Sequence, residues 1–154
     1  MERNMEEYEA FETRMKEKYP KMFSKPYGGF AVGPGWWPIL EGLCAEIYGY
    51  TNWCNNTREA RLKDNPYNLE IPDAVPEVVV EQIKEKFGGL RFYYIGGDDK
   101  IDGMIRMAER WADNACKECG APGSSGGKGW IKTLCPVHRA ESDARYAERF
   151  KNEG

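Results

Sequence analysis

The sequence predicts an α+β fold: a small mixed domain with an antiparallel hairpin packed by three helices, followed by a C-terminal module. Three observations predict it. Apolar residues recur at helical spacing in three segments, a strand-forming run is broken by one glycine turn, and two short Cys/His pairs stand near the C-terminus. At 154 residues the chain is long enough for one hydrophobic core. We expect a helical and hairpin core domain, residues 1–115, continuous with a module at 116–154 in one compact unit.

Apolar residues at spacings of three and four predict the three helices. The first ends near Pro20, the second begins after the Gly/Pro-rich loop 25–35, and the third follows an N-cap at Asp98 or Asp99. Residues 55–76 are expected to form an irregular connection with at most a short helical turn after Thr57. The three apolar stripes are Met5, Tyr8, Phe11, Met15, Tyr19 and Met22; Trp36, Trp37, Leu40, Leu43, Cys44, Ile47 and Tyr48; and Ile101, Met104, Ile105, Ala108, Trp111, Ala112 and Ala115.

The run from Val78 to Ile95 predicts two strands joined at Phe87-Gly-Gly89, hence an antiparallel hairpin. Because side chains alternate along a strand, Leu90, Phe92 and Tyr94 share one face and Arg91, Tyr93 and Ile95 the other. One face would be covered by helices, and the other by a pocket or a partner. A two-stranded hairpin leaves open edges, so self-association into a homo-oligomer is one expectation.

The Cys/His pairs predict a metal site. Cys116 and Cys119 are separated by two residues, as are Cys135 and His138, and fifteen residues lie between the pairs. Two such pairs can converge on one tetrahedral ion, and thiolates with an imidazole suit Zn²⁺. Four protein ligands leave no position for an activated water, so this zinc is expected to be structural. The pairs flank a glycine-rich tip at 120–129 and a short strand at 130–134, and a terminal helix follows.

This order of knuckle, strand and ligand-bearing helix resembles treble-clef zinc modules. That frame also occurs in nucleases whose catalysis needs a further histidine, whereas His138 is the only histidine of this chain. With His138 assigned to the metal, no Ser/His or Cys/His catalytic pair can be assembled. Asp98, Asp99 and Asp102 are better explained by helix capping than by cation binding. The sequence therefore predicts that the protein is not an enzyme.

The composition limits the classes of binding partner and the cellular compartment that we expect. The net charge of −3 argues against indiscriminate binding of nucleic acid, although a local basic patch remains open. We expect no membrane-spanning helix, because no apolar run approaches about 20 residues. Cysteines in CxxC and CxxH pairs, without a signal peptide, indicate a reducing compartment, hence the cytoplasm. Cys44 and Cys54 form no recognisable site, and Cys44 is expected to be a core residue.

Aromatic and arginine side chains beside glycine-rich turns are candidates for binding a ligand or a partner. Trp36 and Trp37 follow one such loop, and Arg91, Tyr93 and Tyr94 lead into another at Gly96-Gly97. Residues of these types anchor many protein interfaces and stack on nucleobases. Most aromatics at helical or strand spacing are nevertheless expected to pack in the core.

Several segments resemble a widespread group of small bacteriophage and prophage proteins. They are the KEKFGGLRFYY segment at 84–94, Ile101-Asp-Gly-Met-Ile105, the CKECGAPG and GWIKTLC segments around the predicted ligands, and Gly35-Trp-Trp-Pro-Ile-Leu40. The likeness covers roughly residues 30–139 and brings no catalytic residues. It implies a context, since small phage accessory proteins often bind host factors and counter bacterial defence.

Two functional hypotheses follow. The first is a non-enzymatic phage accessory protein, in the host cytoplasm, that inhibits antiviral defence by binding a nucleotide second messenger or a host defence protein. The second is a zinc-stabilised nucleic-acid-binding regulator. Its basic patch would comprise Lys117, Lys128, Lys132, Arg139, Arg145 and Arg149, among which Glu118, Glu141, Asp143 and Glu148 are interspersed.

Overall fold

The structure of this chain is a computed structural model that describes residues 4–151. Its elements are α1 (Met5–Lys18), β1 (Phe30–Ala31), a 3-10 helix (Pro34–Trp36), α2 (Trp37–Lys63), β2 (Val79–Lys86), β3 (Gly89–Ile95), α3 (Asp99–Ala112), β4 (Ser124–Gly126), β5 (Lys132–Leu134) and α4 (Pro136–Lys151). Helices dominate and the strands form small sheets, so the predicted α+β class is confirmed.

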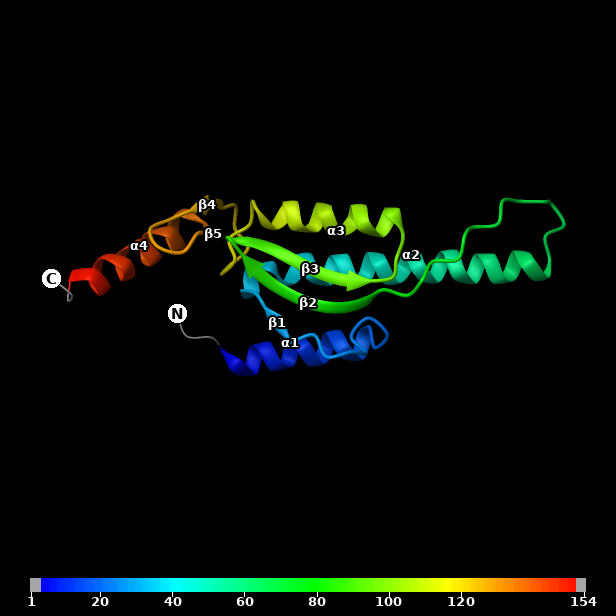
Figure 1. The fold of residues 1–154 in the computed structure, drawn as a ribbon, viewed down its shortest axis with the longest axis horizontal. Coiled ribbons are helices and arrows are strands. Elements are labelled where there is room, and N and C mark those ends of the chain that lie inside the picture. The colour runs from blue at the N-terminus through cyan, green and yellow to red at the C-terminus, as the bar shows by residue number, and fades with distance from the viewer. Residues whose placement is uncertain (1–3, 152–154) are drawn as a thin grey trace.

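The three N-terminal helices surround one small sheet. Figure 1 looks onto this sheet, with α2 behind it and α1 and α3 along its two sides. Val80, Ile83, Leu90 and Phe92 are buried on the covered face, whereas Tyr93 on the opposite face is 41% exposed. One face of the sheet therefore packs on the core and the other meets solvent.

The hairpin forms as predicted, with β2 and β3 antiparallel and Ile83 opposite Phe92. Its two-residue turn places Phe87 and Gly88 at positive φ, which suits the twist of the strands. The expectation of a two-stranded sheet is wrong, because β1 adds a third strand parallel to β2. Two residues inside a Gly/Pro-rich segment carry too little pattern to reveal a strand.

The second helix is longer than the sequence indicates. We expected an irregular connection from residue 55, but α2 continues to Lys63. The chain then returns along the end of α2, and the Asn55 side chain both donates to the Val75 carbonyl and accepts from its N–H. Arg58 donates to the Pro72 carbonyl at 3.1 Å. Polar side chains of the last helical turns thus hold the connection, and this is why the helix lacks an apolar stripe there.

The core contains most residues of the predicted apolar helix stripes, with several exceptions. Phe11, Met15, Trp36 and Leu40 are almost fully buried, and the thiols of Cys44 and Cys54 are buried with them. The exceptions are the exposed side chains of Met5, Tyr48 and Trp111, at 62%, 49% and 66% of their surface. Each of these side chains keeps about half or more of its surface open to solvent, although the Tyr48 ring meets the Tyr19 ring edge-on.

The C-terminal segment forms a small hairpin and a helix at one end of the molecule. β4 pairs antiparallel with β5, so part of the predicted flexible tip is a strand. The terminal helix α4 is present as predicted, yet none of Pro136–Lys151 is buried. In Figure 1 this helix extends away from the rest of the fold.

Candidate metal centre

The backbone around Cys116 and Cys119 forms a tight turn directly after α3. The Gly120 N–H donates to the Cys116 carbonyl at 2.8 Å, and Gly120 has a φ of +82°, which glycine adopts without steric cost. The Cys116 N–H donates to the Ala121 carbonyl at 2.7 Å, and the Lys117 N–H donates to the Thr133 carbonyl at 3.0 Å. These bonds place the first Cys pair against the second hairpin.

The second pair is carried by the start of α4. Cys135 is the last residue before the helix, and its carbonyl accepts from the Arg139 N–H at 2.8 Å. His138 lies in the first helical turn. A three-residue separation across a helix start places both side chains on the same side of the helix, facing the first pair.

The four potential ligand atoms of Cys116, Cys119, Cys135 and His138 all lie within 4.8 Å of one another. The Cys119 and Cys135 sulfurs are 3.8 Å apart, and His138 Nδ1 lies 3.5 Å from the Cys116 sulfur and 3.2 Å from the Cys135 sulfur. In a tetrahedron with Zn–S of about 2.3 Å and Zn–N of about 2.0 Å, sulfurs would be about 3.8 Å apart and sulfur and nitrogen about 3.5 Å. These three separations approach those of a tetrahedral site, and the four side chains lie close enough together to hold a metal ion.

Local hydrogen bonds favour the metal-binding form at Cys135 but not at His138, whose neutral imidazole is the form that binds a metal. The His138 N–H donates to the Cys135 sulfur and lowers the pKa of this thiol to about 7. The Cys135 side chain in turn raises the pKa of His138. Metal binding requires thiolates, so a lowered pKa at Cys135 favours binding at neutral pH.

The metal centre is joined to the core by bonds that the sequence did not reveal. The Gly35 N–H donates to the Lys117 carbonyl at 2.8 Å, and the Trp36 indole N–H donates to the Ala115 carbonyl at 2.9 Å. A Cβ on Gly35 would lie 2.0 Å from the Cys116 carbonyl oxygen. The Gly-Pro-Gly pattern before Trp36 indicated a turn, but only the tertiary structure shows that its glycines allow close backbone approach.

Arg139 fastens the second hairpin to α4. Its guanidinium donates to the carbonyls of Ser124, Gly126 and Lys132 at 2.7–2.9 Å. Lys117 forms an ion pair with Glu85 at 2.8 Å, in which both side chains are mostly buried. Two of the six cations of the predicted basic patch are thus engaged in holding the module together, which leaves Lys128, Lys132, Arg145 and Arg149 as its remaining members.

The two tryptophans predicted to bind a ligand pack in the protein. Trp36 is fully buried, so it presents no face on which a base could stack. Trp37 is half-buried and stacks on Phe11, with ring centroids 4.5 Å apart and an interplanar angle of 6°. The Tyr8 ring meets Trp37 edge-on at 4.8 Å. Both tryptophans therefore join α2 to its neighbours.

The other three candidates are divided between the two faces of β3. Tyr94 points toward α3 and donates to Asp102 at 3.1 Å. Tyr93 lies on the open face beneath the Lys84 ammonium, 5.5 Å from the ring centroid. Arg91 lines a groove of about 410 Å³ with Arg106, Glu109 and Asp113 among its other residues. The structure does not bring the five candidates into one pocket, and ligand binding by Arg91, Tyr93 or Tyr94 stays a prediction.

The acidic residues after Gly97 act as expected for a helix start. The Asp98 side chain accepts from the Ile101 N–H at 3.0 Å and is the N-cap of α3. It also accepts a hydrogen bond of 2.6 Å from the Tyr50 hydroxyl, and this bond raises the pKa of Tyr50. Asp102 is engaged by Tyr94 and by Arg106, at 3.1 and 3.2 Å. Capping and side-chain pairing account for both carboxylates.

Comparisons with protein-family models, with curated proteins and with solved structures find no match to this chain. Within residues 4–151, no helix combines the length and the apolar character that crossing a bilayer requires.

Proposed function

We propose that the protein is a non-enzymatic, zinc-stabilised phage accessory protein that inhibits host antiviral defence by binding a host component. The spacing of the four ligand atoms, which all lie within 4.8 Å of one another, is the observation that supports a structural role for the metal. Three sulfurs and one imidazole nitrogen complete a tetrahedral shell and leave no position for a reacting water. The donor set favours Zn²⁺, since thiolates select it over the harder cations.

The proposed arrangement is a treble-clef-like module, in which the turn at Cys116–Cys119, the β4–β5 hairpin and α4 surround the ion. The module is continuous with the core through the bonds of Gly35 and Trp36. In this arrangement the zinc fixes the position of α4 relative to the sheet. Such ions contribute to folding rather than to chemistry.

An exposed apolar groove supports the binding of a host protein rather than of a nucleotide at Trp36 and Trp37. The groove lies between α2 and α3 and has a volume of about 450 Å³. Met107 and Trp111 line it and are 63% and 66% exposed. Methionine and tryptophan are enriched at protein interfaces, and tryptophan often supplies much of the binding free energy. The resemblance to phage proteins supports a host defence protein as the partner.

The test is capture of host proteins by the full chain from bacteria that carry defence systems, compared between two variants. We expect Met107→Glu to abolish capture of a defence component, because a charge in the groove costs desolvation that no partner group offsets. Trp130→Ser is the control, since Trp130 is 86% exposed in the C-terminal module and is not among the residues that line this groove. The same pair should differ in restoring phage growth on the defended host. Equal capture and equal phage growth with both variants would contradict the proposal.

A further inference from the structure

The open face of the three-stranded sheet carries basic and aromatic side chains. Residues directly opposite each other in an antiparallel ladder lie on the same face, so the ladder places Gln82 beside Tyr93 and Lys84 beside Arg91. Phe92, between Arg91 and Tyr93 in the chain, is buried on the other face. Tyr93 is 41% exposed, and this face is turned toward the viewer in Figure 1. It is therefore accessible to a ligand.

Carboxylates do not neutralise the positive charge of this face. Alternation along β2 places Lys86 on the same face as Lys84, and Arg91 is the third cation. Among residues 4–151, none of these three side chains forms an ion pair. Glu85, between the two lysines in the chain, belongs to the other face and pairs with Lys117 at 2.8 Å. Three unpaired cations on one face attract an anionic ligand.

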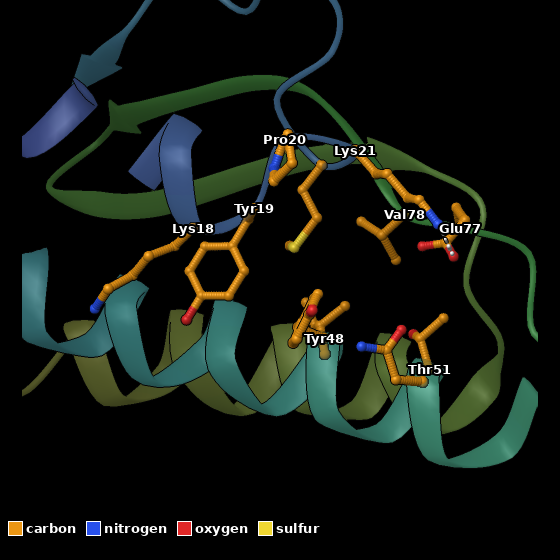
Figure 2. Close-up of a pocket in the computed structure, with 11 residues that line it drawn as sticks. Lys18, Tyr19, Pro20, Lys21, Tyr48, Thr51, Glu77 and Val78 are labelled. Carbon is orange, nitrogen blue, oxygen red and sulfur yellow. Dashed lines mark ion pairs between the residues drawn. The ribbon is translucent and has the colours of Figure 1, made fainter. Parts of the chain in front are cut away.

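The charges at the opposite end of the hairpin are balanced. Figure 2 shows Lys21 reaching toward Glu77, two residues before β2, and their charged atoms lie 3.5 Å apart. Glu81, exposed at the register shift of β2, adds a negative charge to that end. The excess of positive charge on the sheet therefore lies toward the turn that joins β2 and β3.

The positive surface continues past the edge of β3. Arg91 and Arg110 line a groove of about 410 Å³ between β3 and α3, in which the carboxylates are those of Glu109 and Asp113. Glu109 is held by a backbone N–H of β3 at 3.0 Å, and Arg106, the third arginine of the groove, is paired within α3. Arg110 forms no ion pair among the described residues. A phosphate beside this edge would meet two unpaired guanidinium groups.

Two exposed aromatic rings lie beneath the lysines of this face. The Lys84 ammonium is 5.5 Å from the centre of the Tyr93 ring, and the Lys86 ammonium is 5.8 Å from the centre of the Phe87 ring. Lysine side chains are flexible, so each ammonium can move from its ring to a neighbouring phosphate. Surfaces that bind single-stranded nucleic acid combine these two elements, because bases stack on the rings and cations follow the backbone.

Phe87 occupies a turn position that phenylalanine does not suit. Its φ is +53°, and Gly88 follows at +77°. Hairpin turns with two positive φ angles prefer Asn-Gly, and a bulky side chain at positive φ is strained. The Phe87 side chain is 74% exposed, so packing in the core does not offset this strain. Strain without a packing benefit indicates a use of the ring at the surface.

We propose that the open face of the sheet binds single-stranded nucleic acid. Bases would stack on Tyr93 and Phe87, while Lys84, Lys86 and Arg91 contact the phosphates. A single strand fits better than a duplex, since stacking on a side chain requires unpaired bases. The proposal rests neither on the metal centre nor on the groove between α2 and α3.

The experiment is fluorescence anisotropy of labelled oligouridine, oligothymidine and a DNA duplex, each of about 12 nucleotides or base pairs, with the metal-loaded full chain. We expect both single strands to bind more tightly than the duplex. The slope of log K against log salt should be about −2, since each of three phosphate contacts contributes about −0.7. Tighter binding of oligouridine than of oligothymidine would assign the site to RNA, and equal binding to either strand. No binding at low salt, or equal binding of the duplex, would overturn the proposal.

Phe87→Asn separates a binding role of this ring from a structural one. We expect the melting temperature to rise, because Asn-Gly suits the turn, and the affinity for oligouridine to fall about tenfold. Tyr93→Ala should also weaken binding about tenfold, whereas Tyr93→Phe keeps the ring and should bind normally. Tyr67→Ala, at a side chain that is 83% exposed outside this face, is the control. Unchanged affinity in both Phe87→Asn and Tyr93→Ala would overturn the proposal.

Lysine variants distinguish this face from the basic residues of the metal-binding module. Lys84→Ala should make the salt slope shallower by about 0.7, because one phosphate contact is lost. The double variant Lys128→Ala/Arg145→Ala removes two exposed cations of the module and should leave both the affinity and the slope unchanged. If this double variant lost binding while Lys84→Ala kept it, the nucleic acid would bind the module, and the proposal would be overturned.

Discussion

The body at residues 4–115 and the module at 116–151 differ in what holds them together. The body has one continuous core to which α1, α2, α3 and the sheet all contribute. The module has a small cluster in which only Cys116, Leu134 and Cys135 are buried, and α4 adds no buried residue to it. Hydrophobic burial can fold the body, but so small a cluster cannot offset the entropy of ordering the module.

The difference indicates where a bound metal ion would add most to the stability of the chain. In the module, three carbonyls are held by Arg139 and one turn is closed by Gly120. These are polar contacts whose net contribution is modest in water. The Cys₃His cluster lies where the turn, β5 and α4 meet, so one ion there would fix all three. The two regions are joined by the bonds of Gly35 and Trp36, by the Lys117–Glu85 ion pair and by a hydrogen bond from the Thr133 hydroxyl to the Gly88 carbonyl. Each of the following predictions acts on this division.

The largest effect is expected from Cys119→Ser. Cys119 is exposed, so the change removes a ligand atom without opening a cavity in the core. We expect the variant to lose its metal and residues 116–151 to unfold, because structural zinc supplies most of the folding free energy of such modules. Amide NMR signals should collapse to unfolded positions in the module while those of α2 and the sheet persist. If the amide signals of the module stayed dispersed without metal, the proposed difference between the body and the module would be contradicted.

Trp36→Ala should have the next largest effect and should weaken both regions. The ring is fully buried, so truncation is expected to cost about 3–5 kcal/mol of unfolding free energy, measured by urea denaturation. Trp36→Phe keeps most of the ring but leaves the Ala115 carbonyl without the indole donor, at a cost of about 1–3 kcal/mol. A loss of stability confined to the module would show that Trp36 stabilises the module alone.

Gly35→Ala tests the close approach of the two regions. Its Cβ would meet the Cys116 carbonyl oxygen at 2.0 Å, so the backbone must shift, and we expect a cost of about 1–3 kcal/mol and weaker metal affinity. Gly42→Ala is the matched control on α2, where a Cβ meets nothing within 4 Å. That change should stabilise the protein by about 0.5–1 kcal/mol through helix propensity. Equal responses of the two variants would contradict the contact at Gly35.

The smallest effect concerns Tyr27, which belongs to the body alone. Its side chain is buried, and among the described residues its hydroxyl lacks a partner. Burial, aided by Glu12, raises the pKa of Tyr27 from 10.0 to about 12. A raised pKa contributes stability that is complete below pH 10 and is lost as the pH rises toward 12.

Tyr27→Phe should therefore be more stable than the wild type by about 1 kcal/mol at pH 7 and should lose less stability at alkaline pH. Urea denaturation at neutral pH and across the alkaline range measures both effects. Tyr67→Phe, at a side chain that is 83% exposed, is the control and should change neither. A steeper alkaline loss in Tyr27→Phe than in the wild type would contradict the assignment.

The sequence predicted best those features that depend on local spacing. The periodic stripes gave α1, α3 and the start of α2, and alternation gave the faces of β3. The spacing of the two Cys/His pairs predicted that the four ligand atoms lie close together, and the structure confirms this. Features that depend on distant residues were missed: β1 is defined only by its pairing with β2, and the end of α2 is held by side-chain bonds to residues 70–75.

The ligand-binding prediction shows the same limit. From their neighbouring residues alone, Trp36 and Tyr93 are equally good candidates for exposed aromatic side chains that bind a ligand. The structure separates them, because Trp36 is enclosed by the core and donates to the Ala115 carbonyl just before the turn at Cys116, whereas Tyr93 lies on the open face of the sheet. The sequence placed Phe87 at the turn, but only the structure shows that its ring is exposed and its φ is positive.

Native mass spectrometry of the full chain before and after chelation, paired with amide NMR, tests most directly whether a metal ion folds the C-terminal module. We expect one zinc ion per chain, and we expect chelation to unfold residues 116–151 while the sheet and α2 stay folded. A chain that binds no metal, or a module that keeps its fold after the metal is removed, would contradict this expectation.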